Sequence, residues 1–257
     1  MSTTQTTTST VTKSGATSRT VVFAYSLLAY GVGMVSLVWL IACVAGLYPF
    51  GTGPLETTTP ASALAVNAAL IVLFGVQHSV MARKRFKDWL TRLIPPAAER
   101  STYVLMAGVM LGLLLWLWQP MKTVIWTVEN PLASGALWAL FAFGWLYLVA
   151  ATFMTNHFDL FGLRQAWLHL CGRPYTPVPF VRQWMYRYSR HPMMAGMLIG
   201  LWSIPQMQAD HLALAIGLSA YIAIGIVFEE RDLAEHFGEQ YRQHCQEVGV
   251  LLPRLRR

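Results

Sequence analysis

The stretch Tyr188-Ser189-Arg190-His191-Pro192 joins a basic, polar segment directly to an apolar one. Proline has a fixed φ and no N–H, so Pro192 suits the first turn of a helix. His191 precedes a proline and is therefore disfavoured in the α conformation. The junction predicts a helix that begins at Pro192, with free N–H groups beside a histidine and an arginine. Such an arrangement favours an anion.

The composition indicates an integral membrane protein. Hydrophobic residues make up 55% of the 257-residue chain and charged residues only 12%, whereas a soluble domain carries about 25% charged residues. The net charge of +7 comes from basic residues in loops between apolar spans, so we expect no nucleic-acid partner. The three cysteines are far apart and the seven histidines lack metal-ligand spacing, so we expect neither a disulfide framework nor a metal site.

The apolar runs predict an all-α integral membrane protein with six membrane-inserted helices. They cover residues 21–48, 61–81, 101–119, 132–155, 192–208 and 211–228. The last two are separated by only Ala209-Asp210, which predicts a tight antiparallel hairpin. From Glu229 onward the spacing of Leu233, Phe237 and Tyr241 predicts an amphipathic helical tail, broken at Gly238. Residues 1–20, rich in Ser and Thr, are expected to be a disordered tail ahead of one membrane domain, 21–257.

Loop charges predict the orientation. With the N-terminus in the cytoplasm and six spans, every Lys and Arg except Lys122 lies on the cytoplasmic side. This distribution follows the positive-inside rule, so both termini are expected in the cytoplasm of a multi-pass cell-membrane protein. The junction at Pro192 and the start of the tail then share the cytoplasmic face.

The predicted hairpin brings Glu229 and Glu230 close to Arg190 and His191. A helix N-terminus, these charged groups and nearby aromatics suit a ligand that carries anionic and cationic groups with hydroxyls. The alternative is an interfacial salt-bridge cluster that anchors helix ends, because structural ion pairs gather in the same way.

Three polar side chains near the cytoplasmic ends of spans are candidates for acid–base chemistry. His78 follows Gln77 in the second span, and polar groups within a membrane usually face the bundle interior. His157 and Asp159 begin the long polar segment after the fourth span and are candidates for deprotonating a substrate. The alternatives are a hydrogen-bonded interior histidine at position 78, and helix capping by Asn156 or Asp159 beside a surface histidine at position 157.

Several motifs carry a resemblance to known membrane enzymes. Arg190-His191-Pro192 with Gly196, Glu229-Glu230-Arg231 and Phe237-Gly238 with Tyr241 resemble the isoprenylcysteine carboxyl methyltransferase superfamily, over about residues 186–253. Upstream, the stretches 74–83, 99–105 and 156–165 resemble the methanethiol S-methyltransferases, relatives of the NnrU-like proteins. The resemblance implies an S-adenosylmethionine-dependent enzyme that methylates a small thiol, most simply methanethiol to dimethyl sulfide.

The resemblance also implies roles for individual residues. The cofactor-binding candidates are Tyr188, Arg190, His191, Pro192, Gly196, Glu229, Glu230, Phe237 and Tyr241. The catalytic candidates are His157, Asp159, His78 and Arg164. The substrate-binding candidates are Gln77, Asn156, Phe158 and Gln165. A small apolar thiol partitions into the lipid bilayer, so an intramembrane pocket facing the cytosol could collect it while the charged cofactor enters from the cytosol.

Two other functions are compatible with the pattern. One is an NADPH-dependent membrane reductase of the sterol-reductase type, which has a similar C-terminal pattern; the short chain and the upstream motifs argue against it. The other is a non-enzymatic NnrU-like protein that handles haem. No obligate protein partner is expected.

Overall fold

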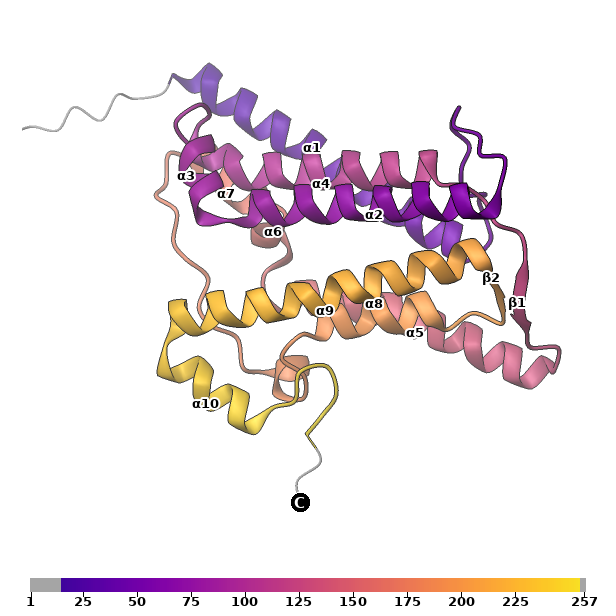
Figure 1. Cartoon of the computed structure of the whole chain (residues 1–257). Helices are drawn as coiled ribbons and strands as arrows, with labels where there is room; N and C mark the ends of the chain where they lie inside the picture. The colour runs from indigo at the N-terminus through magenta and orange to yellow at the C-terminus, as the bar shows by residue number, and fades with distance from the viewer. Residues whose placement is uncertain (1–14, 255–257) are drawn as a thin grey trace, which may run out of the picture.

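A bundle of long apolar helices makes up the protein (Figure 1). The computed structural model describes residues 15–254, and five helices in that part of the chain are long and apolar enough to cross a membrane. They are α1 (Ala16–Val44), α2 (Pro60–Ala82), α4 (Pro96–Leu117), α5 (Pro131–Met154) and α9 (Ala209–Phe237). Helices α2, α4 and α5 each begin with a proline. Proline suits this position because the N–H that it lacks would have no partner within the helix.

The helices form two layers. One contains α1, α2 and α4, and the other contains α5, α9 and the shorter α8 (Pro192–Trp202) (Figure 1). The tightest pairings are α1 with α4 and α5 with α8, while α2 contacts α9 across the layers. A hydrophobic core joins the layers near one end, and its buried members include Leu40, Leu114, Leu115, Trp118, Phe141, Trp145, Leu201, Met207 and Leu214.

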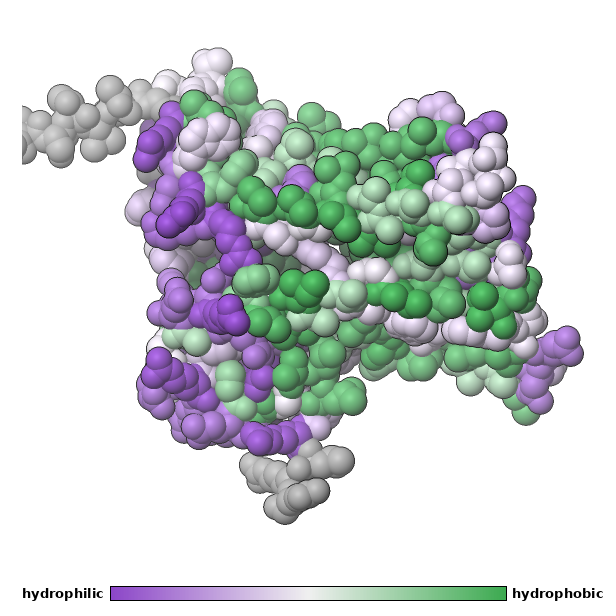
Figure 2. Space-filling model, in the orientation of Figure 1, coloured by the Kyte–Doolittle hydropathy of each residue, from purple (hydrophilic) through white to green (hydrophobic). Residues whose placement is uncertain are grey.

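The two ends of the bundle differ. At one end β1 (Val124–Thr127) pairs with β2 (Gln206–Gln208) in an antiparallel two-stranded sheet. The other end carries α3 (Lys84–Leu90), α6 (His157–Leu160), α7 (Leu163–Leu170), the 3-10 helix η1 (Trp184–Arg187) and α10 (Glu239–Glu247). Figure 2 shows hydrophobic side chains over the middle of one face and hydrophilic ones gathered at this second end. Such a surface fits a multi-pass membrane protein.

The prediction of six membrane-inserted helices is not confirmed, because α8 is too short to span. Its eleven residues rise about 16 Å, roughly half of a hydrocarbon core that is about 30 Å thick. The segment 203–208 continues in a non-helical path and ends in β2, which pairs with β1. The chain therefore still reaches the sheet end before α9 returns.

Two further features of this region differ from the predictions. The predicted hairpin with only Ala209-Asp210 as its connection is wrong: α8 ends at Trp202, α9 begins at Ala209, and α8 packs chiefly on α5. The described chain is mostly helical, as the all-α prediction requires, but the short antiparallel pair of β1 and β2 was not predicted. The β1 sequence, Val-Ile-Trp-Thr, is rich in residues that favour strands.

The ends of the described chain also differ from expectation. Residues 1–14 of the predicted disordered tail lie outside the described residues, and α1 begins at Ala16, so the prediction is wrong for residues 16–20. At the other end, residues 229–237 continue α9 instead of forming a separate helix. Gly238, with φ of +58°, ends α9 and turns the chain into α10, as predicted for that glycine.

Candidate active site

The junction at Pro192 forms as the sequence predicts. Pro192 is the first residue of α8, and His191 stands outside the helix with φ −126° and ψ 63°. The backbone N–H groups of Arg190 and His191 donate to the carbonyl oxygens of Gly249 (3.0 Å) and Val250 (3.1 Å). The chain after α10 thus pairs with the junction, and this pairing fixes the segment that leads into α8.

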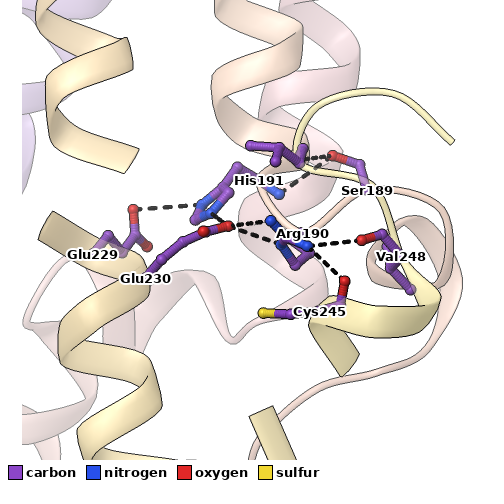
Figure 3. Close-up of polar contacts among 8 residues, drawn as sticks. Ser189, Arg190, His191, Glu229, Glu230, Cys245 and Val248 are labelled. Atoms are coloured by element: carbon purple, nitrogen blue, oxygen red, sulfur yellow. Dashed lines mark hydrogen bonds and ion pairs between the residues drawn. The ribbon is translucent and has the colours of Figure 1, made fainter. Parts of the chain in front are cut away.

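An ion-pair network connects α8, α9 and α10 (Figure 3). Arg190 Nη2 lies 2.7 Å from Glu230 Oε1, and Arg190 Nη1 donates to the carbonyl oxygens of Cys245 (3.0 Å) and Val248 (2.9 Å). His191 Nε2 lies 3.2 Å from the same Glu230 oxygen, and its Nδ1 lies 3.6 Å from Glu229 Oε2. The structure therefore brings together the four charged or titratable residues that the sequence analysis grouped.

The four residues differ in how many hydrogen-bond donors or acceptors remain available for a ligand. Arg190 is largely buried and directs its donors to Glu230 and to backbone carbonyls near the end of α10. Its contacts hold the tail against the membrane helices. The Glu229 carboxylate is 43% exposed and has only the long contact to His191 within the described residues. Glu229 is the member of the network that can take a further partner.

Aromatic side chains surround the network. The ring of Phe180 lies 4.8 Å from that of Phe237 and 5.8 Å from that of Tyr241. The Tyr241 hydroxyl is buried, and burial together with nearby Glu230 raises its pKa. Burial, with Glu229 nearby, raises the pKa of Tyr186 to about 12. Both tyrosines are therefore neutral hydroxyl groups at neutral pH.

Three of the cofactor-binding candidates have other surroundings. Gly196 is buried against α5: a Cβ built on it would lie 2.6 Å from Gly144 O and 2.7 Å from Leu148 N. This glycine permits close helix packing. Pro192 is buried at the helix start, and the side chain of Tyr188 is exposed.

The segment from Asn156 to Gln165 folds around Asp159. Asn156 adopts φ of +84°, and its side chain accepts a hydrogen bond from Asp159 N at 3.2 Å, so it caps α6. Asp159 Oδ1 accepts from Arg164 Nη1 at 2.8 Å, and Asp159 Oδ2 accepts from the Tyr175 hydroxyl at 3.2 Å. The Gln165 amide donates to the Asp159 carbonyl at 3.0 Å. Most of the predicted catalytic and substrate-binding residues of this segment thus meet at Asp159.

His157 is separated from that group. Its ring is buried and stacks on Phe153 with centroids 4.3 Å apart. Its Nε2 lies 2.9 Å from the Tyr30 hydroxyl, and its Nδ1 lies 2.8 Å from the Thr152 hydroxyl. Burial lowers the pKa of His157. Both ring nitrogens have partners, so the observed contacts give His157 a role in anchoring α6 to α1 and α5.

His78 lies elsewhere, between α2 and α4. Its Nε2 is 2.5 Å from the Tyr103 hydroxyl, and its ring is stacked with that of Phe74. The neighbouring Gln77 directs its amide to Met81 within α2. The structure therefore does not place His78 and His157 in a common catalytic pair.

Two cavities border the Asp159 group. A polar cavity of about 700 Å³ contains Arg100, Thr155, Asp159, Gln165, His169 and Tyr175 in its wall. An apolar cavity of about 460 Å³ is lined by Phe23, Leu27, Asn156, Phe158, Leu163, Arg164 and Trp167. The Asp159–Arg164 ion pair joins the two walls. Their volumes fall within the range of roughly 300–1,000 Å³ typical of small-molecule sites.

Buried polar atoms without a hydrogen bond of normal geometry gather at this end of the described chain. They include Gln77 Oε1, His78 Nδ1, Gln165 Oε1, His169 Nε2, Tyr186 Oη and Tyr241 Oη. Leaving such an atom unsatisfied costs about 1–3 kcal/mol. A concentration of these atoms is expected where a polar ligand binds.

Several residues of these groups were not among the site residues predicted from the sequence. Arg100 and Tyr103 lie three positions apart on α4, a spacing that places them on one helix face. The sequence signal that could have identified them is their place in the stretch 99–105, one of those that carry the family resemblance. Tyr175 and Phe180 come from the irregular segment between α7 and η1, where no periodic pattern indicates which side chains turn inward.

Comparisons with known proteins agree on one family. Residues 66–249 match the model of the family described as NnrU protein. Methanethiol S-methyltransferase of Mycobacterium tuberculosis is 52% identical over 191 residues, which cover 74% of this chain and 78% of that protein. Methanethiol S-methyltransferase 1 of Bradyrhizobium diazoefficiens is 44% identical, over 91% of this chain and 82% of that protein. Nurim of Sus scrofa is 28% identical over 66% of this chain. No solved structure matches.

Proposed function

This chain belongs to the NnrU protein family, and we propose that it is an enzyme that methylates methanethiol to dimethyl sulfide, with S-adenosylmethionine as the methyl donor. The observation that carries the proposal is the 52% and 44% identity with proteins named methanethiol S-methyltransferase, over most of both chains. The proposed reaction consumes a thiol and releases dimethyl sulfide, S-adenosylhomocysteine and a proton.

The network around Glu229 and Glu230 fits the cofactor. S-adenosylmethionine carries an ammonium group, a carboxylate and ribose hydroxyls, and it supplies an electrophilic methyl group on a sulfonium. The half-exposed Glu229 carboxylate can accept hydrogen bonds, and the buried hydroxyls of Tyr186 and Tyr241, which lack a hydrogen bond of normal geometry among the described residues, can bind further polar groups. Glu230, held by Arg190 and His191, keeps the end of α9 in place beside them.

The carboxylate of Asp159 suits proton transfer. A thiol reacts as its thiolate, so its proton must be removed. Asp159 lines the polar cavity and is oriented by Arg164 and Tyr175. We assign it the role of proton acceptor, from which the proton passes to solvent in the open cavity. Arg164 adds a positive charge on the side of the apolar cavity, where Asn156 and Phe158 lie.

The decisive experiment is a product assay. Purified protein in detergent or nanodiscs receives S-adenosylmethionine and methanethiol, and dimethyl sulfide is measured in the headspace. We expect product that depends on both substrates, with one S-adenosylhomocysteine formed per dimethyl sulfide. Protein that binds the cofactor but forms no dimethyl sulfide would refute the proposed substrate.

A further inference from the structure

Inside the bundle, the two ring nitrogens of His78 differ in their contacts. Its Nε2 lies 2.5 Å from the Tyr103 hydroxyl. Its Nδ1 is buried and has no hydrogen-bond partner among residues 15–254. This contrasts with His157, whose two nitrogens both contact hydroxyl groups. A buried nitrogen that lacks a partner calls for an explanation, and a catalytic role is one such explanation.

The contact with Tyr103 decides which nitrogen carries the proton. Among the described residues, Nε2 of His78 is the hydrogen-bond partner of this phenol. A buried phenol O–H is satisfied only if it donates, so Tyr103 donates to Nε2. The proton of the neutral imidazole then resides on Nδ1. The guanidinium of Arg100, 4.9 Å from the centroid of the Tyr103 ring, strengthens the phenol as a donor.

We propose that His78 presents its protonated Nδ1 as a hydrogen-bond donor to the sulfur of the bound thiol, and that Tyr103 is the positioning residue that sets this tautomer. The inference rests on the proposed function, because it concerns the same thiol. A donor at this place stabilises the thiolate and orients its lone pair for attack on the methyl group. The thiol proton is finally released to solvent, and His78 remains neutral throughout.

The surroundings of His78 suit a small apolar thiol. The ring of Phe74 is stacked with the imidazole at 5.4 Å, and the ring of Tyr221 meets it edge-on at 6.1 Å. The charged groups near the pair are Arg100 and Glu99 on α4 and Glu229 on α9. Arg100 also lines the polar cavity and donates to the Leu160 carbonyl at 2.7 Å. It therefore links the His78–Tyr103 pair to the segment that holds Asp159.

The tautomer can be measured without turnover. In protein labelled with ¹⁵N-histidine, the ring-nitrogen shifts of His78, assigned by comparison with His78→Asn, should show a protonated Nδ1 and an unprotonated Nε2. In Tyr103→Phe the two tautomers should both be populated. A protonated Nε2 in the wild-type protein, or an unchanged tautomer in Tyr103→Phe, contradicts the proposal. This result is independent of whether methanethiol is the substrate.

Kinetics distinguish a donor from a base. The side-chain amide nitrogen of asparagine can replace Nδ1, whereas alanine cannot replace it and neither substitute titrates. We expect His78→Ala to lower kcat/KM about 10- to 100-fold, the size expected for one hydrogen bond to a charged group. Its pH profile should move to higher pH, because the thiolate loses a donor. His78→Asn should stay within about tenfold of wild type, and the exposed control His236→Asn should match wild type.

Two results would overturn the donor role. One is a His78→Asn enzyme as slow as His78→Ala while both bind S-adenosylmethionine normally, since this would make His78 a base. The other is full activity in His78→Ala. If wild-type protein forms no dimethyl sulfide at all, the proposed function fails, and the nitrogen shifts still decide the tautomer.

Discussion

The guanidinium of Arg190 connects parts of the chain that are far apart in the sequence. It bonds to Glu230 on α9 and to two carbonyl oxygens near the end of α10. An arginine can do this because its planar group carries five donors in a fixed geometry. Because these donors are already used, Arg190 has few left for a ligand carboxylate. We therefore expect it to support cofactor binding by holding the tail in place.

Replacing Glu230 tests the network. In Glu230→Gln the charge that pairs with both Arg190 and His191 is lost, and we expect the affinity for S-adenosylmethionine to fall about tenfold or more. Isothermal titration in detergent measures it. Glu239→Gln, at an exposed ion pair on α10, is the matched control. If Glu230→Gln and wild type bind S-adenosylmethionine with equal affinity, the network does not contribute to cofactor binding.

Asp159 is the second residue whose role can be isolated. In Asp159→Asn the shape of the cavity wall is kept but the proton acceptor is lost, so kcat should fall about 10²- to 10⁴-fold with cofactor affinity unchanged. The control is Asp88→Asn, another acid of the same cavity wall, which pairs with Lys84 at the surface. Loss of cofactor binding in Asp159→Asn would show that Asp159 belongs to the cofactor site.

At the scale of elements, α8 depends on close packing against α5. Gly196, Gly200 and Gly144 lie where the backbones of the two helices nearly touch. Two such contacts one helical turn apart hold this short helix against α5 and help to fix the junction at its N-terminus. Packing of α8 therefore controls where His191 stands.

Gly196→Ala should disturb this interface. The added methyl group would lie 2.6 Å from Gly144 O, a backbone atom that cannot move aside easily. We expect destabilisation of about 1–3 kcal/mol, visible as a lower thermal unfolding midpoint in detergent. Gly225→Ala is the control, because nothing lies within 4 Å of its new methyl group and alanine favours helices. Equal midpoints for the two variants would argue against the close contact.

The docking of α10 should depend on pH. Burial, followed by the charges of Arg182 and Arg190, lowers the pKa of His244 from its ordinary 6.5. The undocked tail therefore takes up a proton first, so docking is stable above about pH 6.5 and weakens as the pH falls below it.

Hydrogen exchange measures this effect. After correction for intrinsic rates, amides of residues 239–247 should exchange faster at about pH 5.5 than at pH 7. In His244→Gln, which does not titrate, the pH dependence should largely disappear. If the variant keeps the wild-type pH dependence, another group is responsible.

At the scale of the whole molecule, both termini are expected on the cytoplasmic side. The segment after α8 reaches the end of the bundle where β1 follows α4, and α9 returns from there. Among residues 15–254, Lys122 lies just before β1 at the sheet end, whereas the other basic residues belong to segments at the opposite end of the bundle (Figure 1). Positive residues remain in the cytoplasm during insertion, so α10 and the candidate site should face the cytosol.

Cysteine labelling tests this orientation. In a background without the three native cysteines, an impermeant maleimide applied to intact cells should modify Lys122→Cys but not Arg254→Cys. After the membranes are opened, both positions should react. Labelling of Arg254→Cys in intact cells would place the site on the outer face.

Local properties of the sequence were sufficient for several features. Hydropathy and charge indicated a membrane protein and located its long helices, because an apolar run of about 20 residues has few other stable environments. The fixed φ of Pro192 determined where α8 begins. The grouping of Arg190 and His191 with Glu229 and Glu230 was also correct, although the predicted hairpin that suggested it was not.

The tertiary structure alone decided how the candidates are distributed. It ended α8 after eleven residues, used the donors of Arg190 to hold the tail, and enclosed His157 among hydroxyls and aromatic rings. It also left one nitrogen of His78 without a partner among residues 15–254. These outcomes depend on partners such as Tyr30, Tyr103 and Tyr175, tens to more than a hundred positions away or within an irregular loop. Periodicity and spacing report only on neighbours along the chain, whereas a side chain's hydrogen bonds are settled by whichever groups the packed helices bring beside it.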